Sequence, residues 1–176
     1  MTAETPSGSL SIVILAAGAG TRMKSTLPKP LHSVAGRPML AHVLDTARRL
    51  DPMDITIVGS RGIDEHLAIS DWSTGVRTTI QHPPRGTADA VRVALDTGAA
   101  GDTVLVLYAD HPLVTADVLS SLIDTHRRSR SRLAVMTCEV GDAAGYGPID
   151  RDDQGRLRSI IEKVDDVLFS GTATTE

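Results

Sequence analysis

The chain alternates between short runs of consecutive apolar residues and longer stretches in which apolar residues recur every three or four positions. The short runs predict strands buried on both faces, and the longer stretches predict helices with one buried face. The predicted strands are Ser11–Leu15, Ile55–Val58, Val76–Ile80, Val104–Tyr108 and Leu133–Thr137. The predicted helices are Pro38–Leu50, Ile63–Ile69, Thr87–Thr97 and Ala116–Arg128. This alternation predicts an α/β fold with parallel strands joined by helical crossovers.

The pattern then changes to a glycine-rich turn followed by two short segments. These segments, Pro148–Asp150 and Leu157–Glu162, flank the polar sequence Asp152-Asp153-Gln154-Gly155. Short apolar segments on either side of a polar turn that contains glycine predict a β-hairpin. We therefore expect one domain at 9–169, between flexible ends at 1–8 and 170–176.

The loop after the first predicted strand is rich in small residues and cations. It reads Leu15-Ala16-Ala17-Gly18-Ala19-Gly20-Thr21-Arg22-Met23-Lys24, with Leu27-Pro28-Lys29 close behind. Residues without bulky side chains let backbone N–H groups approach an anion, and Arg22, Lys24 and Lys29 can neutralise it. Most single lysines and arginines are solvated surface charges, but this position favours phosphate binding. The loop predicts a nucleotide or sugar-phosphate ligand.

Two familiar glycine motifs do not fit this loop. In a dinucleotide-binding fingerprint Met23 would stand at the third glycine, which argues against a Rossmann oxidoreductase. In a P-loop Met23 would replace the second glycine, and Pro28 and Pro30 would break the helix that should begin there. We expect a longer loop that is extended after Lys24.

Composition narrows the function classes further. The 176 residues are 41% hydrophobic, which suits one sizeable core. The formal charge of −4 gives no general attraction to nucleic acid or to an anionic membrane. Cys138 is the single cysteine, so no internal disulfide forms, and no apolar stretch is long enough to span a bilayer. These features predict a cytoplasmic domain, with self-association left open through unpaired sheet edges.

Asp110 follows the apolar run that ends in Tyr108-Ala109, so its carboxylate is expected at a strand's carboxyl end. Ligands of open α/β sheets bind at that edge, and Mg²⁺ is commonly held by one or two carboxylates with substrate phosphates. The alternative is a turn or capping aspartate ahead of His111-Pro112. Gln81 ends another predicted strand, where a polar residue can also be purely structural.

Taken together, the loop, the continuation Leu31-His32-Ser33-Val34-Ala35-Gly36-Arg37-Pro38-Met39, Gln81, Gly86-Thr87-Ala88 and Gly145-Tyr146-Gly147 resemble a known family. They are similar to the nucleotide-sugar pyrophosphorylases of the nucleoside-diphospho-sugar transferase superfamily, and most of all to the N-acetylglucosamine-1-phosphate uridylyltransferases. The resemblance runs from about Ser9 to about Asp166. It implies a Rossmann-like three-layer αβα sandwich of the GT-A type, with a mostly parallel sheet followed by a β-hairpin.

The implied reaction joins UTP and N-acetylglucosamine 1-phosphate into UDP-N-acetylglucosamine and pyrophosphate, a step toward cell-wall peptidoglycan. The resemblance implies catalytic, nucleotide-binding, sugar-binding and metal-binding residues. They are Arg22 and Lys24 for catalysis, Leu15, Ala16, Ala17, Gly18, Gly20, Gln81, Gly86 and Thr87 for the nucleotide, Gly145 and Glu162 for the sugar, and Asp110 for Mg²⁺.

Some positions depart from the family pattern or have a simpler reading. Ala109 replaces the usual glycine, His111 is bulkier than the usual residue, and Pro148 stands where the family often has arginine. Gly86-Thr87 can also be an ordinary helix start, with Thr87 as the N-cap and Asp89 complementing the helix dipole.

Alternatives stay open at this stage. The fuller family domain continues with an asparagine-containing sugar-binding strand, a second metal-ligating asparagine and a β-helix for acetyl transfer, so we expect no acetyl transfer here. Gly86-Thr87-Ala88-Asp89-Ala90-Val91 also resembles adenylyl-glucose enzymes, so another nucleotidyltransferase of the superfamily is one alternative. A catalytically silent nucleotide-binding fragment is the other.

Overall fold

A computed structural model describes residues 8–18, 23–99, 101–140 and 147–160 of the chain. It divides into two compact units, 1–135 and 136–176, which are described separately. The first unit holds the main sheet and its helices, and the second holds a β-hairpin. The single domain expected at 9–169 stays a prediction.

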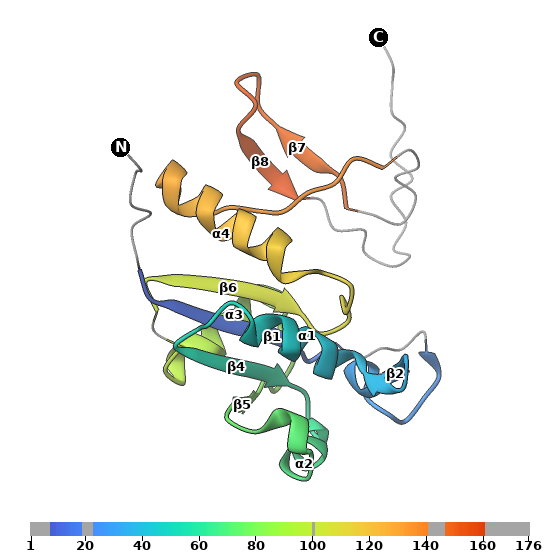
Figure 1. Ribbon diagram of the computed structural model, residues 1–176. Helices are drawn as coiled ribbons and strands as arrows, with labels where there is room; N and C mark the ends of the chain where they lie inside the picture. Colours follow the sequence, from blue (N-terminus) through green and yellow to red (C-terminus); the bar gives the residue numbers. More distant parts are fainter. Residues whose placement is uncertain (1–7, 19–22, 100, 141–146, 161–176) are drawn as a thin grey trace, which may run out of the picture. The chain divides into compact units, whose positions relative to one another are not determined.

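The main sheet is parallel throughout (Figure 1). Its strands are β1 (Leu10–Ala16), β4 (Asp54–Gly59), β5 (Arg77–Ile80) and β6 (Thr103–Tyr108), in the spatial order β5-β4-β1-β6. The chain adds β4 and then β5 on one side of β1, and afterwards returns to add β6 on the other side. The sheet therefore has a topological switch point between β1 and β6, where open α/β sheets bind ligands.

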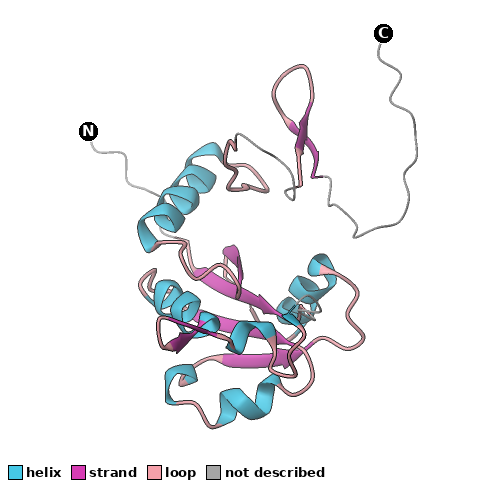
Figure 2. Ribbon diagram, turned by 90° about the vertical axis from the view of Figure 1, so that its right-hand side faces the viewer, coloured by secondary structure: helices cyan, strands magenta, loops and turns pink. Residues whose placement is uncertain are grey.

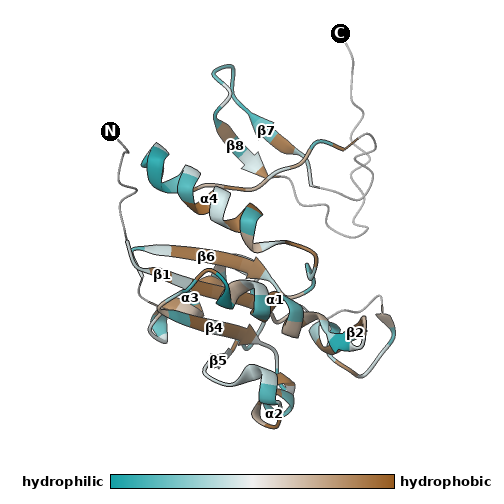
Figure 3. Cartoon of the chain, viewed as in Figure 1, coloured by the Kyte–Doolittle hydropathy of each residue, from teal (hydrophilic) through white to brown (hydrophobic). Residues whose placement is uncertain are grey.

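The central strand β1 is buried on both faces, as its continuous apolar run predicted. Ile12, Val13 and Ile14 are fully buried. Ile12 pairs with Ile55 of β4 on one side and with Leu105 of β6 on the other, which aligns the three strands. In the hydropathy view β4 and β6 are largely brown as well (Figure 3).

Helices cover both faces of the sheet (Figure 2). They are α1 (Met39–Arg48), α2 (Ile63–Ala68), α3 (Thr87–Asp96) and α4 (Ala116–Ser129). Apolar residues of α1, α2 and α4 share one core with Ile12 and Ile14, whereas Ala90 and Ala94 of α3 pack with Val13 on the opposite face. The predicted three-layer αβα arrangement is confirmed. Within the described ranges, no helix combines the length and the apolar character needed to cross a membrane.

The start of α3 differs from the prediction. Gly86 is the N-cap, with φ of 94° and ψ of 176°, and no side chain caps the helix there. Thr87 is already the first helical residue, so its predicted role as N-cap is wrong. The physical reason is the backbone turn into the helix, which uses a region of φ and ψ open essentially to glycine alone.

The segment between β1 and α1 is more structured than an extended loop. It contains the 3₁₀ turn η2 (Lys29–Leu31) and a two-stranded ribbon of β2 (Ser33–Val34) and β3 (Arg37–Pro38). Pro30 at the second position of η2 is buried, so the prolines that exclude an α-helix here favour a tight turn instead. A second 3₁₀ turn, η3 (Asp71–Ser73), precedes β5.

The strand predicted at Leu133–Thr137 is wrong. These residues form no strand, and Leu133 is 67% exposed. In the described part of the chain β6 is an edge of the sheet, and no ladder joins it to this segment. An apolar run becomes a strand only where its backbone finds a partner, and that depends on tertiary context.

The second unit contains the hairpin that the sequence predicted. Strand β7 (Ile149–Arg151) pairs antiparallel with β8 (Leu157–Ile160). Asp152 organises the turn because its Oδ1 accepts hydrogen bonds from the backbone N–H groups of Gln154 and Arg156. Positions 161 and 162 of the predicted second segment lie outside the described residues.

A buried hydroxyl joins the amino ends of the three central strands. Ser11 on β1 is fully buried. Its Oγ donates to Oδ2 of Asp54 at 2.9 Å and accepts from the backbone N–H of Gly101 at 2.8 Å. A Cβ on Gly101 would lie 2.6 Å from the backbone nitrogen of Ser11, so only glycine fits where this turn approaches β1.

We expect Gly101→Ala to lower the free energy of unfolding by about 2 kcal/mol, since the added methyl group forces backbone to move in a closely packed place. Urea unfolding followed by circular dichroism measures the change. Gly8→Ala is the matched control, because a Cβ there makes ordinary contact with Asp102 at 3.4 Å. Equal stability of the two variants would contradict the close approach.

Candidate functional site

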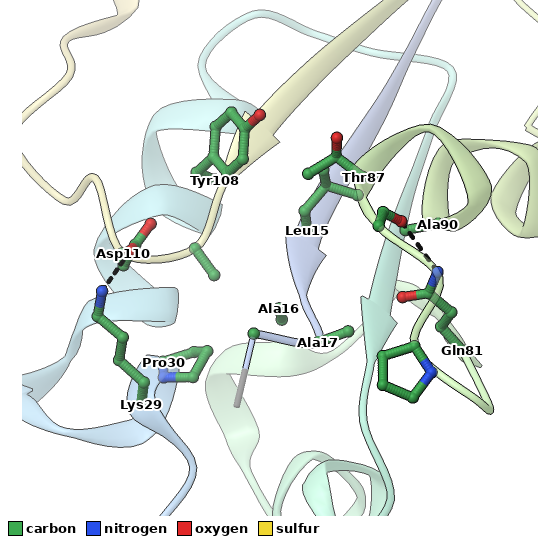
Figure 4. Close-up of a pocket in the computed structure, with 14 residues that line it drawn as sticks. Leu15, Ala16, Ala17, Lys29, Pro30, Gln81, Thr87, Ala90, Tyr108 and Asp110 are labelled. Atoms are coloured by element: carbon green, nitrogen blue, oxygen red, sulfur yellow. Dashed lines mark hydrogen bonds and ion pairs between the residues drawn. The ribbon is translucent and has the colours of Figure 1, made fainter. Parts of the chain in front are cut away.

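A pocket lies at the carboxyl ends of the strands, at the switch point between β1 and β6 (Figure 4). Its lining comes from the ends of β1 and β6, from η2, and from the segment between β5 and the first turns of α3. The residues are Leu15, Ala16, Ala17, Gly18, Lys29, Pro30, Gln81, Pro84, Gly86, Thr87, Ala90, Tyr108, Ala109 and Asp110. Four distant parts of the sequence therefore meet at the edge where ligands of such sheets bind.

The loop after β1 forms one wall from small residues. Leu15 and Ala16 end the strand, and Ala17 and Gly18 leave the sheet along the pocket. A Cβ built on Gly18 would meet no atom of the described residues within 4 Å, so packing against this part of the chain does not require the glycine. The open space beside this backbone suits the close approach of a ligand.

The cations of this loop are distributed differently from the sequence prediction. Gly20 and Arg22 lie outside the described residues. Lys24 is exposed, with a φ of 46°, and does not line the pocket. Lys29, which comes from the 3₁₀ turn η2, does line it. The catalytic roles of Arg22 and Lys24 stay predictions.

Gln81 is fixed at the opposite wall. It follows β5, its backbone N–H donates to the carbonyl of Gly59 at 2.9 Å, and its residue exposure is 4%. Its Nε2 donates to the carbonyl oxygen of Gly86 at 3.0 Å and to Oδ2 of Asp89 at 2.8 Å. The sequence placed Gln81 at the site but gave no sign that Asp89 contacts it.

The start of α3 closes the same wall. Thr87 is exposed and lines the pocket together with Gly86 and Ala90. No cap side chain occupies the amino end of the helix, and Asp89 is the acidic residue of its first turn. The positive end of the helix dipole and a hydroxyl therefore lie beside the pocket.

Asp110 and Lys29 face each other from two elements (Figure 4). The Nζ of Lys29 lies 2.6 Å from Oδ2 of Asp110, and His111 Nε2 lies 3.7 Å from Oδ1. Burial by itself would raise the pKa of Asp110, but the hydrogen bond and charge of Lys29, with the charge of His111, outweigh it and hold this pKa below its ordinary value. The carboxyl is therefore ionised at neutral pH.

The two departures near Asp110 are accommodated. Ala109 is 1% exposed, belongs to the apolar core and donates its N–H to the carbonyl of Leu15 at 3.0 Å. The His111 side chain is largely exposed, and its ring lies 5.3 Å from the Tyr108 ring, centroid to centroid. The Asp110 side chain stays 28% exposed beside them.

The donor set suits a cation that shares its ligands with a substrate. Among the described residues no three His, Cys, Asp or Glu side chains gather to hold a metal by themselves. Asp110 already holds one positive charge, the ammonium of Lys29, against its Oδ2. A single carboxylate at the wall of a ligand-sized pocket fits Mg²⁺, which keeps several waters and phosphate oxygens as ligands.

The structure thus brings most of the described site candidates into one pocket. Those present are Leu15, Ala16, Ala17, Gly18, Gln81, Gly86, Thr87 and Asp110. The two sugar candidates, Gly145 and Glu162, lie outside the described residues. The sequence analysis gave Lys29 no role in the site beyond charge neutralisation. The only sequence feature that pointed to this residue was its positive charge directly after Pro28.

Curated relatives share this part of the chain. The chain is 43% identical over 159 residues to the bifunctional protein GlmU of Bordetella petrii and 46% identical over 160 residues to that of Pseudomonas syringae. Each alignment covers 89% of this chain and 34% of the relative. The chain therefore spans about a third of the length of the curated relatives that it matches.

Solved structures and family comparison agree with the fold. HddC from Yersinia pseudotuberculosis, crystallised in complex with GMP-PN, superposes with a TM-score of 0.63 at 25% identity, over 87% of this chain and 69% of that one. The MobA-like NTP transferase domain matches residues 12–163, from the buried strand β1 past the hairpin. A pocket at the switch point of the sheet and a match over most of the sequence lead to one assignment: the chain belongs to the MobA-like NTP transferase domain family.

Proposed function

We propose that the chain transfers the uridylyl group of UTP to N-acetylglucosamine 1-phosphate, with release of pyrophosphate. The observation that carries this proposal is one pocket that combines the small-residue loop after β1, the fixed amide of Gln81 and the charged pair of Lys29 and Asp110. The identity of 41–46% to proteins named GlmU supports the choice of substrates. The proposed setting is the cytoplasm, in line with the single cysteine, Cys138.

The residues of the pocket suit a reaction governed by alignment and charge. The attacking phosphate oxygen of the sugar phosphate is already anionic, so little proton transfer is required, and neutralisation of the triphosphate dominates. Backbone N–H groups at Ala17 and Gly18 and the ammonium of Lys29 would bind phosphate oxygens, while Gln81 would face the base. Arg22 and Lys24 are proposed to add positive charge from the same loop.

Asp110 is the proposed metal ligand. When bound there, Mg²⁺ would supply charge neutralisation and a template for the phosphate oxygens. The carboxylate keeps its negative charge at neutral pH because Lys29 and His111 lower its pKa, so it is ready to bind a cation. The proposed contacts of Gly145 and Glu162 with the sugar rest on resemblance alone.

Pyrophosphate release from UTP and N-acetylglucosamine 1-phosphate with Mg²⁺ tests the whole proposal. We expect turnover that requires both substrates and stops when a chelator removes the metal. A coupled phosphate assay with purified chain measures the rate, and calorimetry measures the binding of UTP in parallel. Faster turnover with ATP, CTP or GTP would favour another nucleotidyltransferase of the superfamily, and UTP binding without turnover would favour a silent nucleotide-binding fragment.

Asp110→Asn should lower kcat/KM roughly 100-fold, equivalent to about 2.7 kcal/mol of transition-state stabilisation, because the amide no longer binds the cation. The melting temperature should change little, since the ion pair with Lys29 is partly solvated, with 38% and 28% of the two side chains exposed. Differential scanning fluorimetry should also show that Mg²⁺ with UTP stabilises the parent chain but not the variant. Asp117→Asn, an exposed change in α4, is the control, and an equal loss there would contradict the assignment.

Lys29→Met should lower kcat about 10- to 100-fold, because a charge-assisted contact with the triphosphate is lost at the pocket wall. Lys24→Met provides the comparison from outside the pocket. Initial rates at saturating substrates measure both. A smaller loss for Lys24→Met would support the pocket geometry, whereas a loss that equals or exceeds that of Lys29→Met would transfer the main catalytic charge to Lys24.

A further inference from the structure

The carboxamide of Gln81 has its nitrogen fully engaged inside the protein. A carboxamide nitrogen carries two hydrogens, and Nε2 donates to Gly86 O and to Asp89 Oδ2. When Asp89 is ionised, neither partner can donate a hydrogen bond, and both can only accept. A flipped amide would therefore place Oε1 of Gln81 against the oxygens of Gly86 and Asp89. The orientation of this amide is therefore fixed by chemistry, with the nitrogen toward α3.

The oxygen of the same amide is left for the pocket. Figure 4 shows Oε1 of Gln81 directed toward the loop at Ala17, away from the start of α3. None of the hydrogen bonds among the described residues ends on this oxygen. Gln81 therefore offers a ligand an acceptor and no donor.

Asp89 is itself held in place and ionised. Nη2 of Arg92 lies 2.7 Å from Oδ1 of Asp89, leaving Oδ2 for Gln81. The hydrogen bond from Gln81, followed by that from Arg92, holds the pKa of Asp89 below its ordinary value. Asp89 does not line the pocket, so any effect on a ligand must pass through Gln81.

We propose that Asp89 is a positioning residue for base recognition, which locks Gln81 with its acceptor oxygen facing the nucleotide. This inference rests on the proposed function and deepens it. A base that meets this oxygen must present an N–H group, as uracil does at its ring N3. Cytosine presents an unprotonated acceptor at the same ring position, which would face Oε1 without a hydrogen bond. The locked amide thus selects UTP over CTP.

The test compares UTP and CTP in Asp89→Ala and in the parent chain. We expect the KM for UTP to rise about tenfold, the value of one lost hydrogen bond, while kcat at saturation stays within about twofold. The preference for UTP over CTP should fall by a similar factor, because a freed amide can turn its nitrogen toward the base. Asp89→Asn should retain most of the preference, since its amide oxygen can still accept from Nε2.

Two further variants separate positioning from a structural role. Asp96→Asn, on the same helix, removes an exposed partner of the same arginine, 3.4 Å from Nη1 of Arg92, and should leave the UTP preference unchanged. Adding Asp89→Ala to Gln81→Met should change UTP affinity no further, because Asp89 acts through Gln81. An additional loss in the double variant, or a lower melting temperature with an unchanged UTP/CTP ratio, would overturn the proposal.

Calorimetric titration of UTP and CTP, without any sugar phosphate, keeps this inference separate from the proposed reaction. A chain that prefers UTP through Asp89 but shows no sugar-dependent turnover would retain the inference and lose the proposed function. Sugar-dependent turnover without a preference for UTP over CTP in the parent chain would retain the proposed function and overturn the inference. Absence of UTP binding by the parent chain would overturn both.

Discussion

The reversal of sheet growth at β1 is the constraint on which the site depends. Leu15 pairs with Val58 of β4 on one side and with Tyr108 of β6 on the other, so the ends of three parallel strands are level. From these ends the chain continues into α1, α2 and α4 on one face of the sheet, whereas α3, which connects β5 to β6, covers the opposite face. A crevice results wherever such a sheet reverses, and here it receives the loop after β1 and Asp110 after β6.

Within this crevice the ammonium group of Lys29 and the carboxylate of Asp110 neutralise each other. Lys29 and Asp110 form an ion pair at one wall of the pocket, on the side away from Gln81 (Figure 4). A triphosphate with a divalent cation carries the complementary charges, so both residues can change partners without leaving a half-buried charge alone. Under the proposed function, charge balance therefore gives a reason for a cation and a carboxylate in one small space.

The sequence predicted those strands that can be recognised from their own residues, without knowledge of their neighbours in the fold. Strands β1, β4 and β6 were found to within two residues because each is apolar on both faces, whatever lies beside it. Leu133–Thr137 has the same composition but no partner strand, and pairing is a property of the fold rather than of the segment.

The candidate site, like the fold, could be predicted only in part from the sequence. Asp110, Gln81 and the loop at Gly18 follow strand ends, a position that can be recognised from sequence. The contact of Asp89 with Gln81 and the place of Lys29 depend on how α3 and η2 pack against the strand ends. Spacing along the chain carries no information about such packing, which is why the sequence analysis assigned the catalytic role to Lys24, although Lys29 is the lysine that lines the pocket.

The buried hydroxyl of Ser11 lies at one end of a strand whose other end opens into the pocket. The strand is seven residues long, and its Ser11 and its last residue, Ala16, are five positions apart, or roughly 16 Å of extended chain. The buried anchor and the proposed nucleotide-binding edge are thus separate regions of the protein. Under the proposed function, mutation can remodel that edge while the anchor stays intact, so a lineage with this architecture can acquire a new nucleotide preference without first passing through an unstable intermediate.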